Sequence, residues 1–132
     1  MSNTGNAIRS SLAPWITVNN IVKAVDFYRR ALGATEAYRM EDPDGNLQVV
    51  KLAIDDAEFW LSTSGEGSPE QAVGGGTVRM ILTVTNPDAI FNQALQAGAI
   101  EVFPVGEEYG WRLGRLIDPF GLHWEIGRQL SE

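Results

Sequence analysis

The chain of 132 residues carries a formal net charge of −7 and has no cysteine. This length fits a single domain with a hydrophobic core of its own. The negative charge argues against nucleic acid and against an anionic membrane surface as partners, because both attract Lys and Arg. The missing cysteines exclude a disulfide framework, a thiolate nucleophile and a cysteine-based metal site.

Residues 1–11 are rich in Ser, Asn and Gly, which predicts a flexible N-terminal arm. This stretch lacks the apolar centre of a signal peptide, and no apolar run approaches the ~20 residues of a membrane helix. We therefore expect a cytoplasmic protein without a membrane partner.

The first half of the chain predicts the order strand, helix, strand, strand, strand. A strand at 14–18 precedes a helix that begins at Asn20, a good N-cap, and ends at Gly33. Strands follow at 35–40, 47–53 and 57–62, separated by turn-forming residues at 42–45 and 55–56. The helix is expected to bury an apolar stripe of Val22, Val25, Phe27, Tyr28 and Leu32.

Residues 63–76 interrupt this pattern with Gly, Ser, Pro and Glu, and we interpret them as a linker. Their three consecutive glycines could instead form a phosphate-binding loop. However, the Lys-Ser/Thr pair of such a loop is missing and no buried strand precedes the glycines.

The second half repeats the order of the first. A strand at 80–84 precedes a helix capped by Asn86 and Pro87 and ended by Gly98, and strands follow at 100–105, 112–117 and 122–126. The run Gly-Ala-Ile-Glu after the second helix mirrors Gly-Ala-Thr-Glu after the first. The repeat predicts an α+β domain at 12–132, built from two tandem βαβββ modules at 12–62 and 77–128.

Two segments carry a family resemblance: VNNIVKAVDFYRRALGA at 18–34 and RLIDPFGLHWEIG at 115–127. With them the chain resembles the vicinal oxygen chelate superfamily over about residues 12–128. That superfamily includes glyoxalase I, bleomycin-type resistance proteins and extradiol dioxygenases, and the chain is most similar to its PhnB-like and antibiotic-resistance-like branch. The resemblance implies a cupped mixed sheet with helices on its outer face, and a homodimer whose clefts are often shared between chains.

The resemblance also implies where a metal would bind. Metal-dependent members take His or Gln and Glu ligands from strands one, four, five and eight. Glu125 matches the strand-eight ligand, but Ala13, Trp60 and Arg79 stand at the other three positions. Arginine has no lone pair to donate, so we expect no metal cofactor and an ion pair between Arg79 and Glu125. His123 could replace a lost ligand, but a His-x-Glu pair is a sparse metal motif.

Strand alternation separates the residues that face a cleft from those that face the core. The expected ligand-binding residues are Trp15, Thr17, Trp60, Arg79, Ile81, Trp111, His123 and Glu125. Their strand neighbours Ile16, Val18, Phe59, Leu61, Met80, Leu82, Trp124 and Ile126 are expected to form the core. The tryptophans have an alternative role in the core or a dimer interface, which we favour for Trp124.

The predicted aromatic cleft suits a planar or amphipathic small molecule. The first hypothesis is therefore a metal-independent binding protein that sequesters such a compound in a dimeric cleft. The alternative is a glyoxalase-like lyase or isomerase, or a dioxygenase, with His123, Glu125 or Glu58 as general base. A third option is a structural or regulatory subunit.

Overall fold

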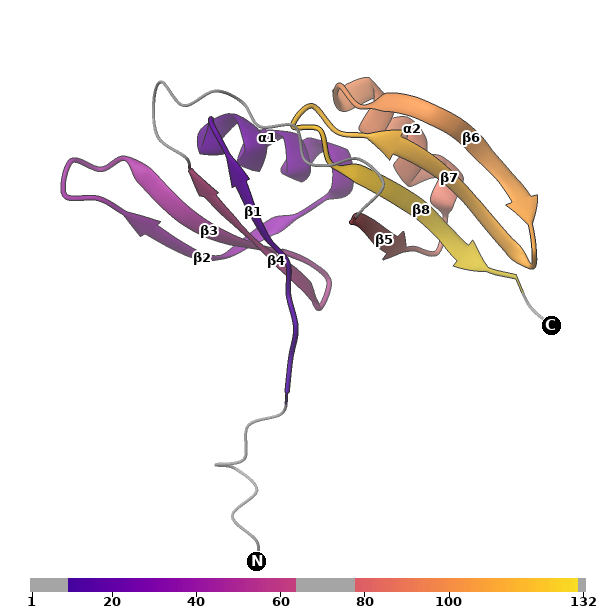
Figure 1. The fold of residues 1–132 in the computed structure, drawn as a ribbon, viewed down its shortest axis with the longest axis horizontal. Coiled ribbons are helices and arrows are strands. Elements are labelled where there is room, and N and C mark those ends of the chain that lie inside the picture. Colours follow the sequence, from indigo (N-terminus) through magenta and orange to yellow (C-terminus); the bar gives the residue numbers. More distant parts are fainter. Residues whose placement is uncertain (1–9, 64–77, 131–132) are drawn as a thin grey trace, which may run out of the picture.

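The computed structural model describes residues 10–63 and 78–130, which form two βαβββ modules in tandem (Figure 1). Module one comprises β1 (Trp15–Val18), α1 (Ile21–Leu32), β2 (Thr35–Glu41), β3 (Leu47–Ile54) and β4 (Ala57–Thr63). Module two comprises β5 (Arg79–Thr83), α2 (Pro87–Ala97), β6 (Ile100–Glu108), β7 (Trp111–Ile117) and β8 (His123–Gln129). The predicted α+β class and duplicated order are confirmed. Most of the predicted arm at 1–11 and linker at 63–76 lies outside the described residues.

Both helices begin and end where their capping residues predict. The side chains of Asn20 and Asn86 accept backbone N–H groups of the first turns, and Gly33 and Gly98 follow the last turns with positive φ. The predicted stripe of α1 was wrong at one position, because Val22 is 65% exposed. No helix in the described ranges is long and apolar enough to cross a bilayer.

Each module forms a four-stranded mixed sheet. The first sheet has the order β1-β4-β3-β2 and the second has the order β5-β8-β7-β6. The pairs β1–β4 and β5–β8 are parallel, and the other two pairs of each sheet are antiparallel. Within the described residues no strand of one sheet pairs with a strand of the other. The cupped sheet that the resemblance implies is thus made of two separate halves.

Corresponding residues of the two modules occupy the same places in their sheets. Trp15 lies opposite Trp60 across β1 and β4, and Ile81 lies opposite Glu125 across β5 and β8. This register is the one that the sequence repeat predicts when Trp60 is aligned with Glu125. A residue of one module can therefore be compared directly with its counterpart in the other.

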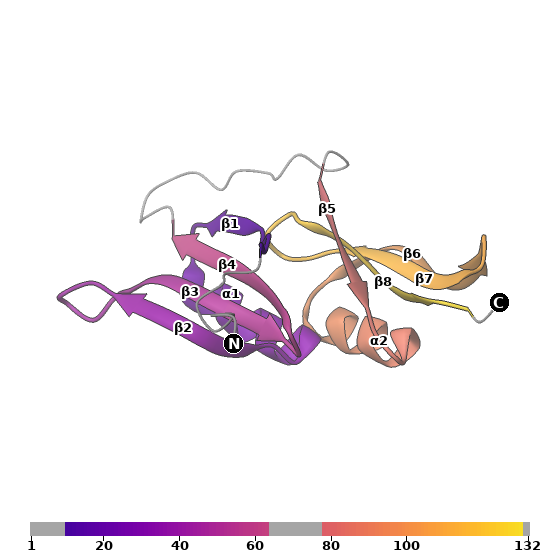
Figure 2. The ribbon, with the colours of Figure 1, turned by 90° about the horizontal axis from the view of Figure 1, so that it is seen from below.

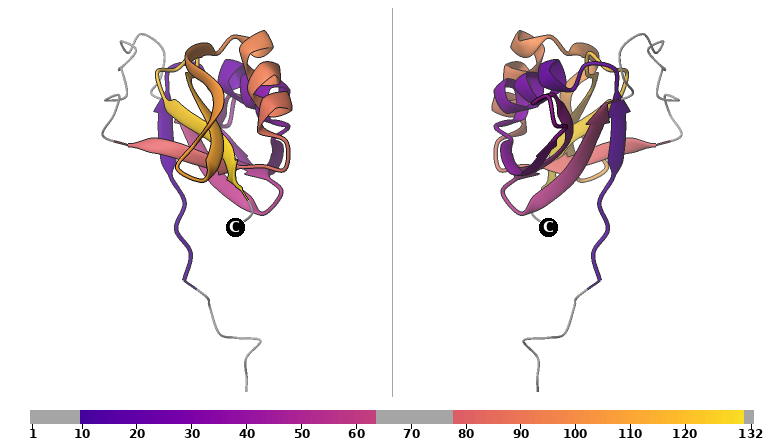
Figure 3. Two further views of the ribbon diagram at one scale, coloured as in Figure 1. Left: turned by 90° about the vertical axis from the view of Figure 1, so that its right-hand side faces the viewer. Right: turned by 90° about the vertical axis from the view of Figure 1, so that its left-hand side faces the viewer.

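The helices cover one face of each sheet and pack against each other. Helix α1 contacts β3 and β4, while α2 contacts β6, β7 and β8. Figures 2 and 3 show both helices on the same side of the two sheets. We call the opposite, uncovered surface of each sheet its open face.

One hydrophobic core joins the two modules. The ring of Phe59 lies 5.8 Å from that of Trp124, and Phe27 lies 5.9 Å from Phe120. The side chain of Gln93 on α2 also donates to the carbonyl of Ala31 at the end of α1, at 3.0 Å. These contacts pass from one module to the other, so the modules share their packing.

Candidate functional site on the open faces

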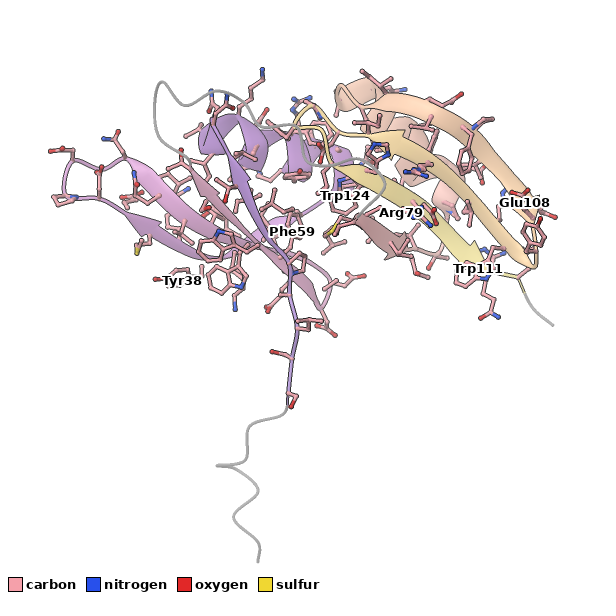
Figure 4. The ribbon with its side chains drawn as sticks, in the orientation of Figure 1. Tyr38, Phe59, Arg79, Glu108, Trp111 and Trp124 are labelled. Carbon is pink, nitrogen blue, oxygen red and sulfur yellow. The ribbon has the colours of Figure 1, made fainter. Side chains whose placement is uncertain are left out.

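Strand alternation distributes the predicted site residues as expected. The neighbours predicted to face the core are buried, except for Met80, which is partly buried against it. Among the tryptophans, the core role favoured for Trp124 is confirmed. The predicted site residues alternate with these core residues along the strands and point away from the helices. Figure 4 labels Tyr38 on the first sheet, and Arg79 and Trp111 on the second.

The open face of the first sheet carries an aromatic cluster. The indoles of Trp15 and Trp60 stack with ring centroids 5.8 Å apart and planes 25° apart. Tyr38 contributes a third ring, which meets Trp60 edge to face at 5.8 Å. Trp15 is 57% exposed, so its indole remains free to stack on a further flat ring.

A cation also lies over this cluster. The ammonium of Lys51 stands 5.0 Å from the ring centroid of Trp60 and 3.5 Å from the carboxylate of Glu58. The ammonium is thus held by both an aromatic face and a carboxylate. Glu58, which was a candidate general base, is occupied by this ion pair.

The open face of the second sheet is charged. Nε of Arg79 lies 3.0 Å from Oε2 of Glu125, so the predicted ion pair is present. Arg79 and His123 are cross-strand neighbours, as are Arg115 and Glu125. Four polar side chains from β5, β8 and β7 therefore stand together on this face.

Arg115 determines which tautomer His123 adopts. Nε and Nη2 of Arg115 lie 3.2 and 3.0 Å from Nδ1 of His123. An arginine N–H can only donate, so Nδ1 accepts and the ring proton is on Nε2. In this arrangement His123 offers a donor toward a bound molecule, which does not suit the general-base role considered for it.

A small pocket of about 210 Å³ opens beside these charges on the second sheet. Its walls are mostly apolar, with the carboxylate of Glu125 and the hydroxyl of Thr83 as polar groups. The lining residues are Ile81, Leu82, Thr83, Trp111, Leu113, Glu125 and Gly127. Three predicted site residues, Ile81, Trp111 and Glu125, are therefore brought together here.

The two modules differ at the position of Gly127, which lines the pocket. Gly127 lies opposite Thr83, whereas the corresponding residue of module one, Ser62, lies opposite Thr17. The hydroxyls of Thr17 and Ser62 are hydrogen-bonded at 3.0 Å. Module two has no counterpart of this hydrogen bond, because Gly127 has no side chain to pair with Thr83.

The other predicted site residues are not in the pocket. Trp15, Thr17 and Trp60 belong to the first sheet and do not line it. Within the described part of the chain, the predicted single cleft is thus divided between two open faces. Arg112 lies on the helix side, where Asp88 of α2 accepts hydrogen bonds from its guanidinium at 2.6 and 2.7 Å.

Sequence reasoning missed Gly127 and gave little weight to Arg115. The internal repeat carried a signal for both, because it aligns Gly127 with Ser62 and Arg115 with Lys51. A glycine in one copy and a side chain in the other marks a place where the two surfaces differ in depth.

Three comparisons with known proteins agree on the ancestry of the chain. A profile of the family described as the Glyoxalase/Bleomycin resistance protein/Dioxygenase superfamily matches residues 10–126. An uncharacterized protein of Mycobacterium bovis is 35% identical, over 95% of this chain and 87% of the relative. The crystal structure of TioX from a Micromonospora species is similar with a TM-score of 0.71 and 25% identity, over 92% of this chain and all of that one.

A further solved structure is similar in fold alone. The fosfomycin resistance protein FosX from Listeria monocytogenes matches with a TM-score of 0.71 at 14% identity, over 93% of this chain and 95% of its own. At this identity the likeness establishes that the two chains share an architecture, and function must be argued from the site.

Proposed function

Since the chain belongs to the glyoxalase/bleomycin resistance protein/dioxygenase superfamily, we propose that it is a metal-independent member that binds a planar aromatic or amphipathic small molecule. It does so as a cytoplasmic homodimer, in a cleft to which both open faces contribute. The observation that carries this proposal is the stack of Trp15 and Trp60, in which Trp15 is 57% exposed, because a solvent-facing indole is a surface on which flat rings bind.

The donor atoms on the open faces do not fit a catalytic divalent metal. Such sites use about three protein ligands, and the described residues contain no group of three or more His, Cys, Asp or Glu side chains placed to share an ion. Arg79 further opposes a cation next to Glu125, because its permanent positive charge already pairs with that carboxylate. This chemistry supports binding by stacking and shape.

The size of the pocket supports a cleft completed by a second copy. Pockets for drug-sized molecules measure about 300–1,000 Å³, whereas this one measures about 210 Å³. In each sheet the strand at one edge, β1 or β5, has a free side in the described chain. Ile81 on β5 is 60% exposed, as expected of an apolar side chain that a second copy covers.

Tryptophan fluorescence tests the binding function. We expect 2-naphthamide, a flat neutral compound, to quench the emission saturably and to be recovered unchanged. Replacing Trp15 with Ala should weaken binding about tenfold, because one face of the stack is lost, in line with about 1–3 kcal/mol per stacked ring. The matched control is Val22→Ala, which trims an exposed apolar side chain on the helix side.

Two outcomes would contradict the proposal. Unsaturable quenching, or equal binding by wild type and Trp15→Ala, removes the stacking surface from the function. Calorimetric titration with nickel, zinc and iron provides the second arm, and sub-micromolar binding of any of these ions would overturn metal independence.

A further inference from the structure

Because the two modules are equivalent, the charged residues on one open face can be compared with those at the same positions on the other. Lys51 lies opposite Trp60 in module one, and Arg115 lies opposite Glu125 in module two. Glu58 on β4 and His123 on β8 are likewise equivalent. Glu58 lies opposite Ala53, two residues after Lys51, and His123 lies opposite Ile117, two residues after Arg115. Each module thus places a cation on its third strand diagonally from a polar side chain on its fourth.

The two modules treat this cation differently. In module one the ammonium of Lys51 is paired with the carboxylate of Glu58 at 3.5 Å. In module two the imidazole of His123 stands in place of the carboxylate, and its Nδ1 lies 3.2 and 3.0 Å from Nε and Nη2 of Arg115. Among the described residues no carboxylate lies within 4.0 Å of Arg115, so its charge has no counterion.

Donor atoms remain free at this place. Nη1 of Arg115 and Nε2 of His123 make no hydrogen bond with the described residues. The same part of the chain holds no buried side-chain nitrogen or oxygen without a partner, so both atoms are open to solvent. The neighbouring pair of Arg79 and Glu125 adds no net charge, and this patch is positive on a chain of net charge −7.

The free donors adjoin the pocket. Glu125, the cross-strand neighbour of Arg115, lines it. So does Leu113, which stands two residues before Arg115 and therefore on the same face of β7. A molecule with its apolar part in the pocket would reach Arg115 and His123 with a polar group at its end.

We propose that Arg115 and His123 form a subsite for an anionic group, so that the ligand is an aromatic or amphipathic anion. Arg115 contributes the charge and one N–H, and His123 contributes the Nε2–H that Arg115 orients. Hydrogen bonds from a cationic donor to an anion are about twice as strong as neutral ones. This inference rests on the proposed function, because it adds the charge of the ligand to a cleft that binds its ring.

A matched pair of probes tests the subsite: 2-naphthoate and 2-naphthamide, which share a ring and differ in charge. Wild-type protein should bind the carboxylate about tenfold more tightly than the amide. Arg115→Gln should abolish that preference by weakening the binding of the carboxylate. His123→Glu should abolish it too, because it recreates in module two the ion pair of Lys51 and Glu58 while retaining Arg115.

The control for net charge is Arg128→Gln. Arg128 is on the same strand, β8, but is exposed on its other face, opposite Arg112. This variant should keep the tenfold preference, and thermal unfolding of each variant identifies any that fails to fold.

The outcomes separate the two proposals. Equal affinity of wild type for both probes overturns the anion subsite and leaves the aromatic binding function standing. A preference that survives in Arg115→Gln or disappears in Arg128→Gln also overturns the subsite. Failure of both probes to bind overturns the proposed function itself.

Discussion

Asp118, a polar residue at 3% exposure, receives four hydrogen bonds in the core. Its Oδ1 accepts the backbone N–H groups of Phe120 and Leu122 at 2.9 and 3.0 Å. Its Oδ2 accepts the hydroxyl of Tyr28 at 2.5 Å and the indole N–H of Trp124 at 2.9 Å. Burial raises the pKa of Asp118 above its ordinary value, although the four donors act in the opposite direction. The carboxylate thereby ties α1 of module one to the last turn of module two.

Asp118→Asn should destabilise the protein by about 1–3 kcal/mol, because all four partners are donors and the amide N–H₂ would face donors instead of accepting from them. Urea unfolding measures the change. The control is Asp26→Asn, which breaks an exposed ion pair with Arg30 and should cost less than about 1 kcal/mol. Similar losses in both variants would mean that the four hydrogen bonds contribute little.

Tyr28 gives the protein a pH dependence at the alkaline end. Burial, followed by the nearby charge of Asp118, raises the pKa of Tyr28 well above its ordinary value of 10.0. The folded state therefore holds this proton more tightly than the unfolded state, and the resulting stability is present below pH 10 and lost as the pH rises through the folded pKa.

We expect the free energy of unfolding of the wild type to fall above pH 10 more steeply than that of Tyr28→Phe. The variant lacks the hydroxyl and should be less stable than wild type at pH 8. Its free energy of unfolding should change less with pH above pH 10. Denaturant titrations across this range provide the measurement, and parallel curves for the two proteins would contradict the prediction.

At the residue scale the sequence predicted local roles better than distant ones. Asp118 and Gly121 form a local turn, in which the N–H of Gly121 donates to the carbonyl of Asp118 at 3.1 Å. The bond from Tyr28 was not predictable, because 90 residues separate the two side chains. The ion pair of Arg79 and Glu125 was predicted because the family resemblance places both residues at metal-ligand positions, where an arginine can only pair with the carboxylate.

The elements of the two modules differ most at Gly127 on β8. A Cβ there would stand 2.5 Å from Cβ of Leu113 and 2.6 Å from the carbonyl oxygen of Arg112. Real atoms do not approach so closely, so β7 passes β8 at a distance that only glycine permits. Gly127 and Leu113 both line the pocket, so a side chain at position 127 would disturb its wall.

Gly127→Ser should destabilise the protein by about 1–3 kcal/mol, since β7 and β8 must separate. The variant should also lose binding of 2-naphthamide. Gly106→Ser is the control, because nothing lies within 4 Å of a Cβ at that position, and it should change stability by less than about 0.5 kcal/mol. Thermal unfolding compares the two, and equal effects would show that the close approach of the strands is not the cause.

Element boundaries were predicted best where a capping residue marks them. Asn20, Gly33, Asn86 and Gly98 defined both helices. The prediction for β6 was too short, because it ended at residue 105 and the strand continues to Glu108. Pro104 lies inside this strand, which is possible because β6 is at the edge of its sheet and its register shifts between Phe103 and Gly106.

On the scale of the whole molecule, the shared core makes the modules interdependent. Tyr28, Phe27 and Phe59 of module one all contact residues of the last turn or strand of module two. Calorimetry should therefore show one transition, with equal calorimetric and van't Hoff enthalpies. Two resolved transitions would mean that each module folds by itself.

A second prediction at this scale concerns assembly. Sedimentation equilibrium should give twice the chain mass of 14.4 kDa, because the proposed cleft needs a second copy to complete it. A mass of one chain at every concentration would remove the shared cleft from the proposed function.

The sequence could not predict that the site residues are divided between two sheets. Alternation assigns Trp60 and Glu125 to equivalent faces of their own sheets, but says nothing of the distance between those faces. That distance follows from how α1 and α2 pack, which is decided by contacts such as Gln93 with Ala31. The residues of the site were therefore predictable individually, while their grouping was not.

The common register of the two modules also makes the molecule suitable for transplanting side chains. A residue moved from one open face to its counterpart keeps its backbone frame and leaves the packing beneath the helices untouched. Exchanging Trp60 and Glu125 would place an aromatic ring on the open face of module two and a carboxylate on that of module one, with the backbone of both sheets kept. A duplicated chain of this kind can evolve new specificity by copying from itself.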